Sequence, residues 1–217
     1  MPGLPLFAKQ GVSVKVKVIS AVAVILLYAV AAAAQQNEVS LTIGAMKTGD
    51  SSLAASTGDP NAHTDTSFAL QVGYSGRFFT AGLASLYFDF PLAVTPKTNL
   101  VTSNALSVRS YSSLYFTPGI KLKLLPLAKV SPYVVGGVGL ARLAPSDRLV
   151  NGQPANSDAK INVAYSFGGG LDVKVAPFIS LRGEVRDYNT VTPAFTITLF
   201  KERQHNALIS GGVVLRF

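Results

Sequence analysis

Cysteine and tryptophan are absent from this chain of 217 residues, and only 14% of its residues are charged. Without cysteine it can form neither a disulfide framework nor a thiolate metal site. A soluble domain usually has roughly 25% charged residues, and the mean hydropathy here is +0.35. Even so, no stretch after residue 34 approaches the ~18 consecutive apolar residues of a membrane helix. The apolar residues are spread along the chain, which favours a protein whose whole outer wall faces lipid.

The positive charge does not indicate a nucleic-acid-binding surface. The net charge is +8 and the isoelectric point is about 9.8, a balance that nucleic-acid binders also have. Three of the cations, Lys9, Lys15 and Lys17, precede residue 35, where no acidic residue occurs, and subtracting them leaves +5 for the rest. No run rich in Lys or Arg follows. The sequence therefore predicts no nucleic-acid partner.

The first 34 residues have the order of a secretory signal peptide. The three lysines precede a continuous apolar run, residues 18–34, which ends in four alanines. A positive segment, an apolar segment and small residues at the −3 and −1 positions are typical of a cleaved signal. Ala32 and Ala34 fill those two positions, which predicts cleavage before Gln35. The alternative is an uncleaved anchor, because the run has about the minimum length to cross a membrane.

Residues 35–217 form one predicted domain in which apolar and polar residues alternate. Such a period of two is the signature of β-strands. Eight segments show it: 38–47, 67–78, 79–94, 107–123, 132–143, 162–175, 178–188 and 206–217. Because lipid offers no hydrogen bonds, strands that face it must close into a barrel. The predicted fold is all-β, an eight-stranded antiparallel up-and-down transmembrane β-barrel that follows a helical signal peptide.

The connections alternate between short and long, as in outer-membrane barrels, where short turns face the periplasm and longer loops face outward. We expect short turns near Gly76-Arg77, at 124–129 and at Ala176-Pro177. The expected long loops are 48–66, 95–106, 144–161 and 189–205. Both ends of the barrel domain then lie in the periplasm. The first loop carries Asp50, Asp59 and Asp65 with many Ser and Thr residues. It is either an adhesive surface or, as we favour, a solvated loop.

Several charged residues fall on the face of the strands that should point into the lumen. The clearest are Arg182, Glu184 and Arg186, which alternate along one strand. Their expected partners are Asp89, Asp172, Lys174 and, less clearly, Arg142. An eight-stranded barrel is only just wide enough for its own side chains. We therefore favour a paired polar core over an ion path, with Glu184 as the acid whose loss costs most.

Aromatic residues near strand ends are candidates for the interfacial girdle of a membrane barrel. They are Tyr133, Tyr165, Tyr188, Phe178 and Phe217. The facing of the Gly-rich strand 132–143 stays open on sequence grounds. The clusters Gly136-Gly137-Val138-Gly139 and 168–170 lack the Lys-Ser/Thr of a phosphate-binding loop and lead into no helix. We expect them to allow close packing in a narrow barrel.

The last strand ends in Phe217, and Leu215, Val213, Gly211 and Ile209 continue its apolar face. This pattern resembles the C-terminal signal that the outer-membrane barrel-assembly machinery reads. Segments 132–141 and 167–188 are similar to the OmpA/OmpX-like outer membrane protein beta-barrel domain family. The resemblance covers roughly residues 36–217 and implies the barrel fold, not an activity. Because the chain stops at Phe217, we expect no OmpA-type peptidoglycan-binding domain.

No constellation points to catalysis, a metal or a cofactor. The two histidines, His63 and His205, fall in expected loops, and a metal site there would need further ligands, for which Asp59 or Asp65 could serve. The lipid A deacylases of this barrel size use a His-x-Ser pair on a strand, and neither histidine here is followed by that pattern. The outer-membrane acyltransferases need a histidine at membrane level, which is also missing from the expected strands. The sequence therefore predicts no enzyme, cofactor or metal site.

The favoured role is structural or surface-interactive, in the outer membrane of a Gram-negative bacterium. The expected partners are outer-membrane lipid and, during biogenesis, the Sec translocon and the barrel-assembly machinery, with a monomer as the expected state. A narrow porin-like pore for ions or small solutes is the second hypothesis. A soluble lipocalin-like barrel is the third. It would need an apolar interior, which the charged inward residues oppose.

Overall fold

Strands make up most of the chain that the computed structural model describes, namely residues 36–49, 61, 63–101, 110–145, 151, 158–191 and 203–217. The strands are β1 (Asn37–Thr48), β2 (His63–Thr64), β3 (Ser67–Ala81), β4 (Ala84–Val101), β5 (Ser110–Phe116), β6 (Gly119–Leu124), β7 (Val130–Pro145), β8 (Lys160–Ala176), β9 (Ile179–Val191) and β10 (Arg203–Arg216). In this part of the chain, no helix is long and apolar enough to cross a membrane.

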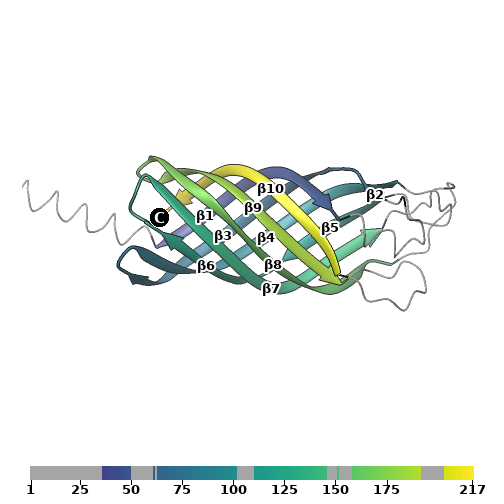
Figure 1. Cartoon of the computed structure of the whole chain (residues 1–217), viewed down its shortest axis with the longest axis horizontal. Coiled ribbons are helices and arrows are strands. Elements are labelled where there is room, and N and C mark those ends of the chain that lie inside the picture. Colours follow the sequence, from purple (N-terminus) through teal and green to yellow (C-terminus); the bar gives the residue numbers. More distant parts are fainter. Residues whose placement is uncertain are drawn as a thin grey trace, which may run out of the picture.

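The strands close into a ring (Figure 1). Each pairs antiparallel with its neighbours in the order β1-β3-β4-β5/β6-β7-β8-β9-β10, and β10 returns to β1. Strands β5 and β6 lie end to end between β4 and β7, and the chain is interrupted between them at Thr117-Pro118. Together they make up one of the eight strands of the barrel wall, which we call staves. The two-residue β2 only extends the sheet beside β4. The eight-stranded antiparallel barrel that the sequence predicts is confirmed.

The seam between the first and last strands is fully hydrogen-bonded. The register runs from Glu38 opposite Arg216 to Thr48 opposite Asn206. Beyond it, the Asn37 amide donates to the Phe217 carbonyl at 2.9 Å, and the Phe217 amide donates back at 3.0 Å. Closure leaves no strand edge among the staves, which is what a sheet in lipid requires.

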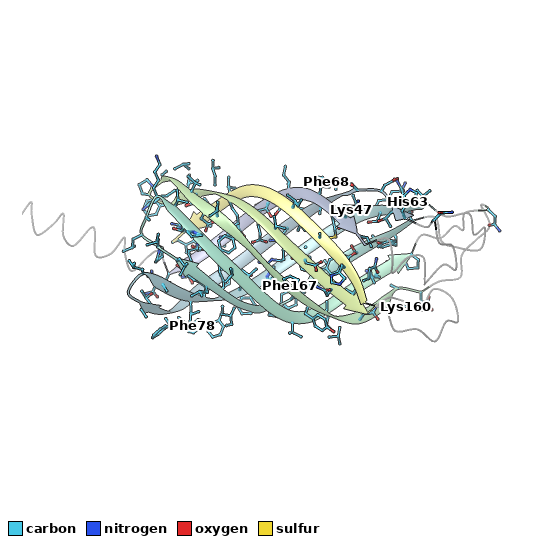
Figure 2. The ribbon with its side chains drawn as sticks, viewed as in Figure 1. Lys47, His63, Phe68, Phe78, Lys160 and Phe167 are labelled. Carbon is cyan, nitrogen blue, oxygen red and sulfur yellow. The ribbon has the colours of Figure 1, made fainter. Side chains whose placement is uncertain are left out.

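The outer wall is apolar on every stave. Large side chains such as Ile43, Val134 and Val185 are more than half exposed, and Figure 2 shows Phe68 and Phe78 projecting away from the barrel. Such a continuous apolar exterior is far larger than the patches that monomeric soluble proteins expose. It fits the lipid-facing band of a membrane barrel.

The barrel has two different ends. At one, which we call the turn end, lie the short turns Gly82-Leu83, 125–129 and Pro177-Phe178, together with the start of β1 and the end of β10. At the other, the loop end, the strands lead into the longer connections. Most residues of those connections lie outside the described ranges, as does the whole predicted signal peptide with Ala32, Ala34 and Gln35.

The predicted turn at Gly76-Arg77 is wrong. Gly76 pairs with Phe88 inside the sheet, and β3 continues to Ala81. A bulge between Arg77 and Phe79 breaks the alternation, and this break imitates the end of a strand in the sequence. The chain reverses instead at Gly82, whose φ of 55° is the left-handed conformation that favours glycine.

Other strand limits also differ from the prediction. Strand β4 runs to Val101, through residues expected to be loop, because a bulge between Thr95 and Thr98 restores its pairing with β5. The predicted strand 107–123 is split at Thr117-Pro118, since proline has no amide hydrogen for the ladder. The facing of β7 is now settled, with Val135 and Leu143 inward and Val134 outward.

The split stave explains why β7 is rich in glycine. A Cβ atom at Gly139 would lie 1.9 Å from the Phe116 carbonyl oxygen, whereas at Gly136 the nearest atom is 3.9 Å away. Gly139 therefore accommodates a backbone approach from β5, and Gly136 does not. This supports the expectation of close packing at Gly139 but not at Gly136.

We predict that Gly139→Ala lowers the free energy of unfolding by about 1–3 kcal/mol, because the methyl group must displace backbone. The matched variant Gly136→Ala, on the same strand, should stay within about 0.5 kcal/mol of the parent. Urea unfolding of the refolded barrel in micelles measures both. Equal stability of the two variants would contradict the close approach.

Candidate functional site in the barrel lumen

The lumen contains most of the buried charge of the described chain. Nine charged side chains are buried: Glu38, Asp89, Lys121, Lys123, Asp172, Arg182, Glu184, Arg186 and Arg216. Five are cations and four are carboxylates, which leaves a surplus of one positive charge. Charges removed from water are costly unless they are paired and hydrogen-bonded. The arrangement of partners therefore decides whether this interior is stable.

The first group, the turn-end cluster, consists of Glu38, Lys123, Asp172, Arg182 and Arg216. Arg182 donates two hydrogen bonds to the Asp172 carboxylate, from Nε at 2.8 Å and from Nη2 at 2.9 Å. Lys123 Nζ donates to Asp172 Oδ2 at 2.6 Å and also contacts the Glu38 carboxylate. Arg216 lies 3.4 Å from Glu38 and 3.5 Å from Asp172, without hydrogen-bond geometry. Two carboxylates thus neutralise most of three cations.

The second group, the mid-lumen cluster, consists of Asp89, Lys121, Glu184 and Arg186. Arg186 bridges the two acids, donating from Nε to Glu184 Oε1 and from Nη2 to Asp89 Oδ2, both at 2.9 Å. Lys121 Nζ lies 2.9 Å from Asp89 Oδ1 and donates to the Ser75 hydroxyl at 2.6 Å. This cluster is balanced, with two acids and two cations.

Neutral side chains complete the coordination of Glu184. The Tyr133 hydroxyl donates to Oε2 at 2.6 Å, and Gln71 Nε2 donates to Oε1 at 2.8 Å. The Tyr188 hydroxyl in turn donates to Gln71 Oε1 at 2.8 Å. The Tyr133 ring also lies 4.8 Å from the Arg182 guanidinium, a cation–π contact. Tyr133 therefore joins the two clusters.

An apolar layer crosses the lumen beyond the mid-lumen cluster, toward the loop end. Each of the eight staves contributes one buried residue to it: Met46, Ala69, Ala93, Tyr115, Ala141, Ala164, Tyr188 and Leu208. The rings of Tyr115 and Tyr188 meet with centroids 4.8 Å apart. Four alanines and four large side chains share the cross-section, which is how a narrow interior is filled without voids.

Uncharged polar side chains occupy the lumen nearest the loop end. The Thr48 hydroxyl donates to Asn206 Oδ1 at 2.8 Å and lies 3.3 Å from the Tyr111 hydroxyl. The Ser67 hydroxyl donates to that of Thr98 at 2.9 Å. From the turn end to the loop end, the interior is thus charged, then apolar, then neutral polar.

The structure brings most of the sequence-predicted lumen residues together. Five of them lie in the two clusters: Asp89, Asp172, Arg182, Glu184 and Arg186. Lys174 does not join them. It is half-buried at the turn end, and none of the ion pairs found in the described chain involves it. Arg142 faces outward near the end of β7, so its predicted inward facing is wrong.

Sequence analysis missed Glu38, Lys121, Lys123 and Arg216 as lumen residues. The signal was present, because each alternates with the apolar residues of its own strand. Two girdle candidates were also misplaced, since Tyr133 and Tyr188 are buried in the lumen. Phe178 and Phe217 do face outward, each about half exposed. The four large members of the C-terminal pattern, Ile209, Val213, Leu215 and Phe217, line the outer wall of the seam.

Neither histidine lies in a catalytic or metal-binding constellation of the described chain. His205 belongs to β10 rather than to a loop, and its Nδ1 lies 2.8 Å from Asp187 Oδ2 on the outer wall. His63 Nδ1 lies 3.0 Å from the Asn61 carbonyl oxygen. No group of three potential metal ligands from His, Cys, Asp and Glu occurs among the described residues.

The model of the family described as "Outer membrane protein beta-barrel domain" matches residues 20–217. The chain belongs to this family. It is therefore a protein of the cell outer membrane, which agrees with the apolar wall and the closed seam. The predicted resemblance is confirmed.

Three known structures are similar to this chain, and the first of them supports the fold. Neisserial surface protein A (NspA) is 14% identical with a TM-score of 0.52, and the match covers 84% of this chain and 97% of that chain. The N-terminal β-barrel domain of Pseudomonas aeruginosa OprF is 12% identical, with a TM-score of 0.43 and coverages of 84% and 98%. The outer membrane enzyme PagL is 16% identical, with a TM-score of 0.43 and coverages of 83% and 99%. No curated protein matches the chain.

We predict that Glu184→Ala lowers the free energy of unfolding by about 3–5 kcal/mol, because it leaves Arg186 with half its partners in a buried site. Asp65→Ala is the control, since this acid is exposed at the loop end and takes part in none of the ion pairs found in the described chain. That change should cost at most about 1 kcal/mol. Urea unfolding in micelles compares the two, and equal losses would argue against a stabilising network.

Proposed function

We propose that this outer-membrane barrel is a closed structural and surface-contact protein of the cell envelope, without catalysis. The observation that carries the proposal is the filled lumen. The eight residues of the apolar layer are at most 3% exposed, and Lys121, Lys123 and Asp172 are fully inaccessible. A channel wide enough for water would leave the side chains that line it accessible.

The order of the interior layers also opposes a pore. An ion that entered from the turn end would meet two clusters whose charges are already paired. It would then meet the apolar layer, whose described polar side-chain atoms are two tyrosine hydroxyls, too few to replace its hydration. The side chains of the charged clusters and of the apolar layer would both have to rearrange to let an ion pass, and each group is held by contacts from several staves.

The wall and the interior have the wrong polarity for a lipocalin-like ligand barrel. Such a protein needs a polar exterior and an apolar cavity. Here the exterior is apolar and the centre holds nine buried charges. The balance of polarity supports a membrane barrel packed with its own side chains.

The absence of catalysis rests on the two histidines of the chain. A hydroxyl nucleophile needs an adjacent base, most often histidine. Within the described residues, His205 contacts a carboxylate and His63 a backbone carbonyl, and neither hydrogen-bonds a hydroxyl. The surroundings of both histidines support a non-enzymatic role.

For orientation and partners, we place the turn end in the periplasm and the loop end at the cell surface, as the lengths of the connections suggest. The lipid around the apolar wall is then the permanent partner, and the loops supply the contact surface. Export through the Sec translocon and insertion by the barrel-assembly machinery are part of the proposal. Full closure supports a monomer, because no stave needs a partner for its hydrogen bonds.

Single-channel recording in planar bilayers tests this proposal against the pore. We expect no steady openings from the parent protein. Arg186→Ala combined with Tyr188→Ala removes inward side chains from the network and the apolar layer, and should produce openings. The matched double variant Val185→Ala with Asp187→Ala truncates the outer face of the same strand and should stay closed. Steady openings of the parent would favour the pore.

A further inference from the structure

The turn end carries two hollows that the closed-barrel role does not require. One, of about 380 Å³, lies between the β3–β4 turn and the β6–β7 turn. Its lining is Arg77, Thr80, Gly82 and Leu83 from the first and residues 125–128 from the second. The other, also about 380 Å³, is lined by Gln36, Arg77, Phe78, Phe79 and Thr80. Each has the size of a small-ligand site, and Arg77 and Thr80 belong to both.

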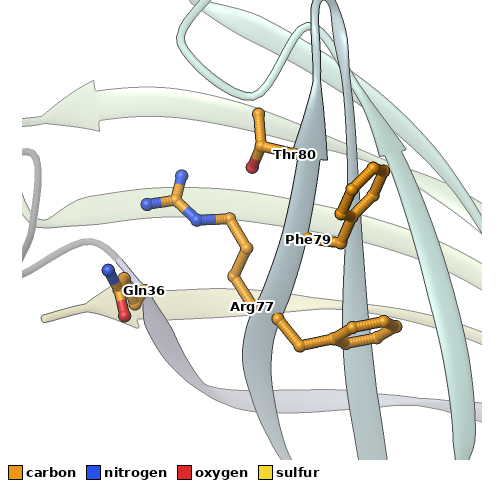
Figure 3. A pocket seen from close by; sticks show the side chains of 5 residues that line it. Gln36, Arg77, Phe79 and Thr80 are labelled. Carbon is orange, nitrogen blue, oxygen red and sulfur yellow. The ribbon is translucent and has the colours of Figure 1, made fainter.

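Arg77 lines both hollows. Arg77 keeps the inward facing of Ser75, and the bulge after it puts Phe79 on the opposite side of the strand, so that the guanidinium extends on the side of Gln36 and Thr80 (Figure 3). An arginine presents a planar fork of donors that matches a phosphate or carboxylate. The phenylalanines on the other side continue the lipid-facing wall. The site therefore lies beside the membrane surface.

The wall of the first hollow is apolar. Leu127 is 78% exposed and Leu83 is 72% exposed, the two highest values among the large apolar residues of the described chain. Both stand at turns, where water or lipid headgroups would otherwise surround them. Exposed apolar residues grouped around a hollow mark a binding surface. Leu125 and Pro126 complete the lining.

The charge of this end favours an anion. Outside the turn-end cluster, the charged side chains of the described turn end are Arg77, Lys129 and Lys174, all cationic. Lys129 and Lys174 are neighbours, because the Lys174 amide donates to the Lys129 carbonyl at 2.7 Å. The turn-end cluster beneath them adds its own surplus positive charge. An anionic group would thus be attracted to the opening, and a cation repelled.

We propose that the hollow between the β3–β4 and β6–β7 turns binds an anionic amphiphile, namely a phospholipid of the periplasmic leaflet. Its phosphate would sit against Arg77, and its alkyl chain would cover Leu83, Leu125 and Leu127. The lipid reaches the site from the membrane beside Phe78 and Phe79. The inference rests on the orientation proposed above, but not on whether the lumen conducts.

The chain contains no tryptophan, so Leu127→Trp supplies a background-free fluorescent reporter in the hollow. The reporter protein, folded in a nonionic detergent, is titrated with a short-chain phosphatidylglycerol. We expect a saturable blue shift of the emission. Adding Arg77→Gln should weaken binding about tenfold or more, because charge-assisted hydrogen bonds to the phosphate are lost. Adding Lys47→Gln, a lysine on the outer wall at the opposite end (Figure 2), should leave the affinity unchanged.

Three results would overturn the proposal. Equal affinity with Arg77→Gln would remove the role of the guanidinium. Inorganic phosphate that competes as well as the whole lipid would indicate a plain anion site. An uncharged diacylglycerol that binds as tightly would indicate an apolar patch alone. Should Arg77→Gln fail to fold, Leu83→Asn tests the apolar half of the site with the same reporter, and unchanged affinity would again overturn it.

Discussion

Closure between β1 and β10 is the constraint on which the rest of this structure depends. A strand in lipid has no water to satisfy an unpaired edge, so the first and last staves must meet in register. That register fixes which residues face inward, because a slip of one residue would exchange the two faces of a strand. It also places Glu38 opposite Arg216. The seam thus completes the turn-end cluster with one residue from each end of the barrel domain.

The narrow bore then determines what the inward residues can be. With only eight staves, side chains from opposite walls must touch, and any charge among them is shielded from water. The nine buried charges are tolerable because they are paired across several strands, with Tyr133 and Gln71 supplying further hydrogen bonds. Where no charge is available, the barrel is filled by four alanines and four large side chains. Ion pairs among the buried charges and close packing in the apolar layer both follow from the narrow bore.

The fold was predictable from the sequence because alternation needs only local information. Alternation on β9 alone places Arg182, Glu184 and Arg186 on one face. The same reading of β1, β6 and β10 would have found Glu38, Lys121, Lys123 and Arg216. What alternation cannot give is a bulge, which reverses facing without leaving a strand, as at Arg77-Phe79. Alternation also puts Tyr188 on the inward face of Arg186, so its place in the lumen was predictable, whereas Tyr133 stands on the Gly-rich strand whose facing the sequence leaves open.

The bulge in β3, which the sequence suggested was a turn, follows directly on Arg77, which lines the hollow that the closed barrel does not explain. An uninterrupted β3 would keep the inward and outward positions in strict alternation to its end. The bulge instead leaves Phe78 and Phe79 both exposed, while Arg77 points to the other side. A cation and an apolar pair then flank one strand at the membrane boundary, beside the exposed leucines of the next turn. Bulges are frequent at barrel rims and beside binding sites, where they re-aim a side chain. This one re-aims Phe79, while the Arg77 guanidinium keeps its inward facing and lines the apolar hollow. A cation beside an apolar surface complements the phosphate and the alkyl chain of an anionic lipid.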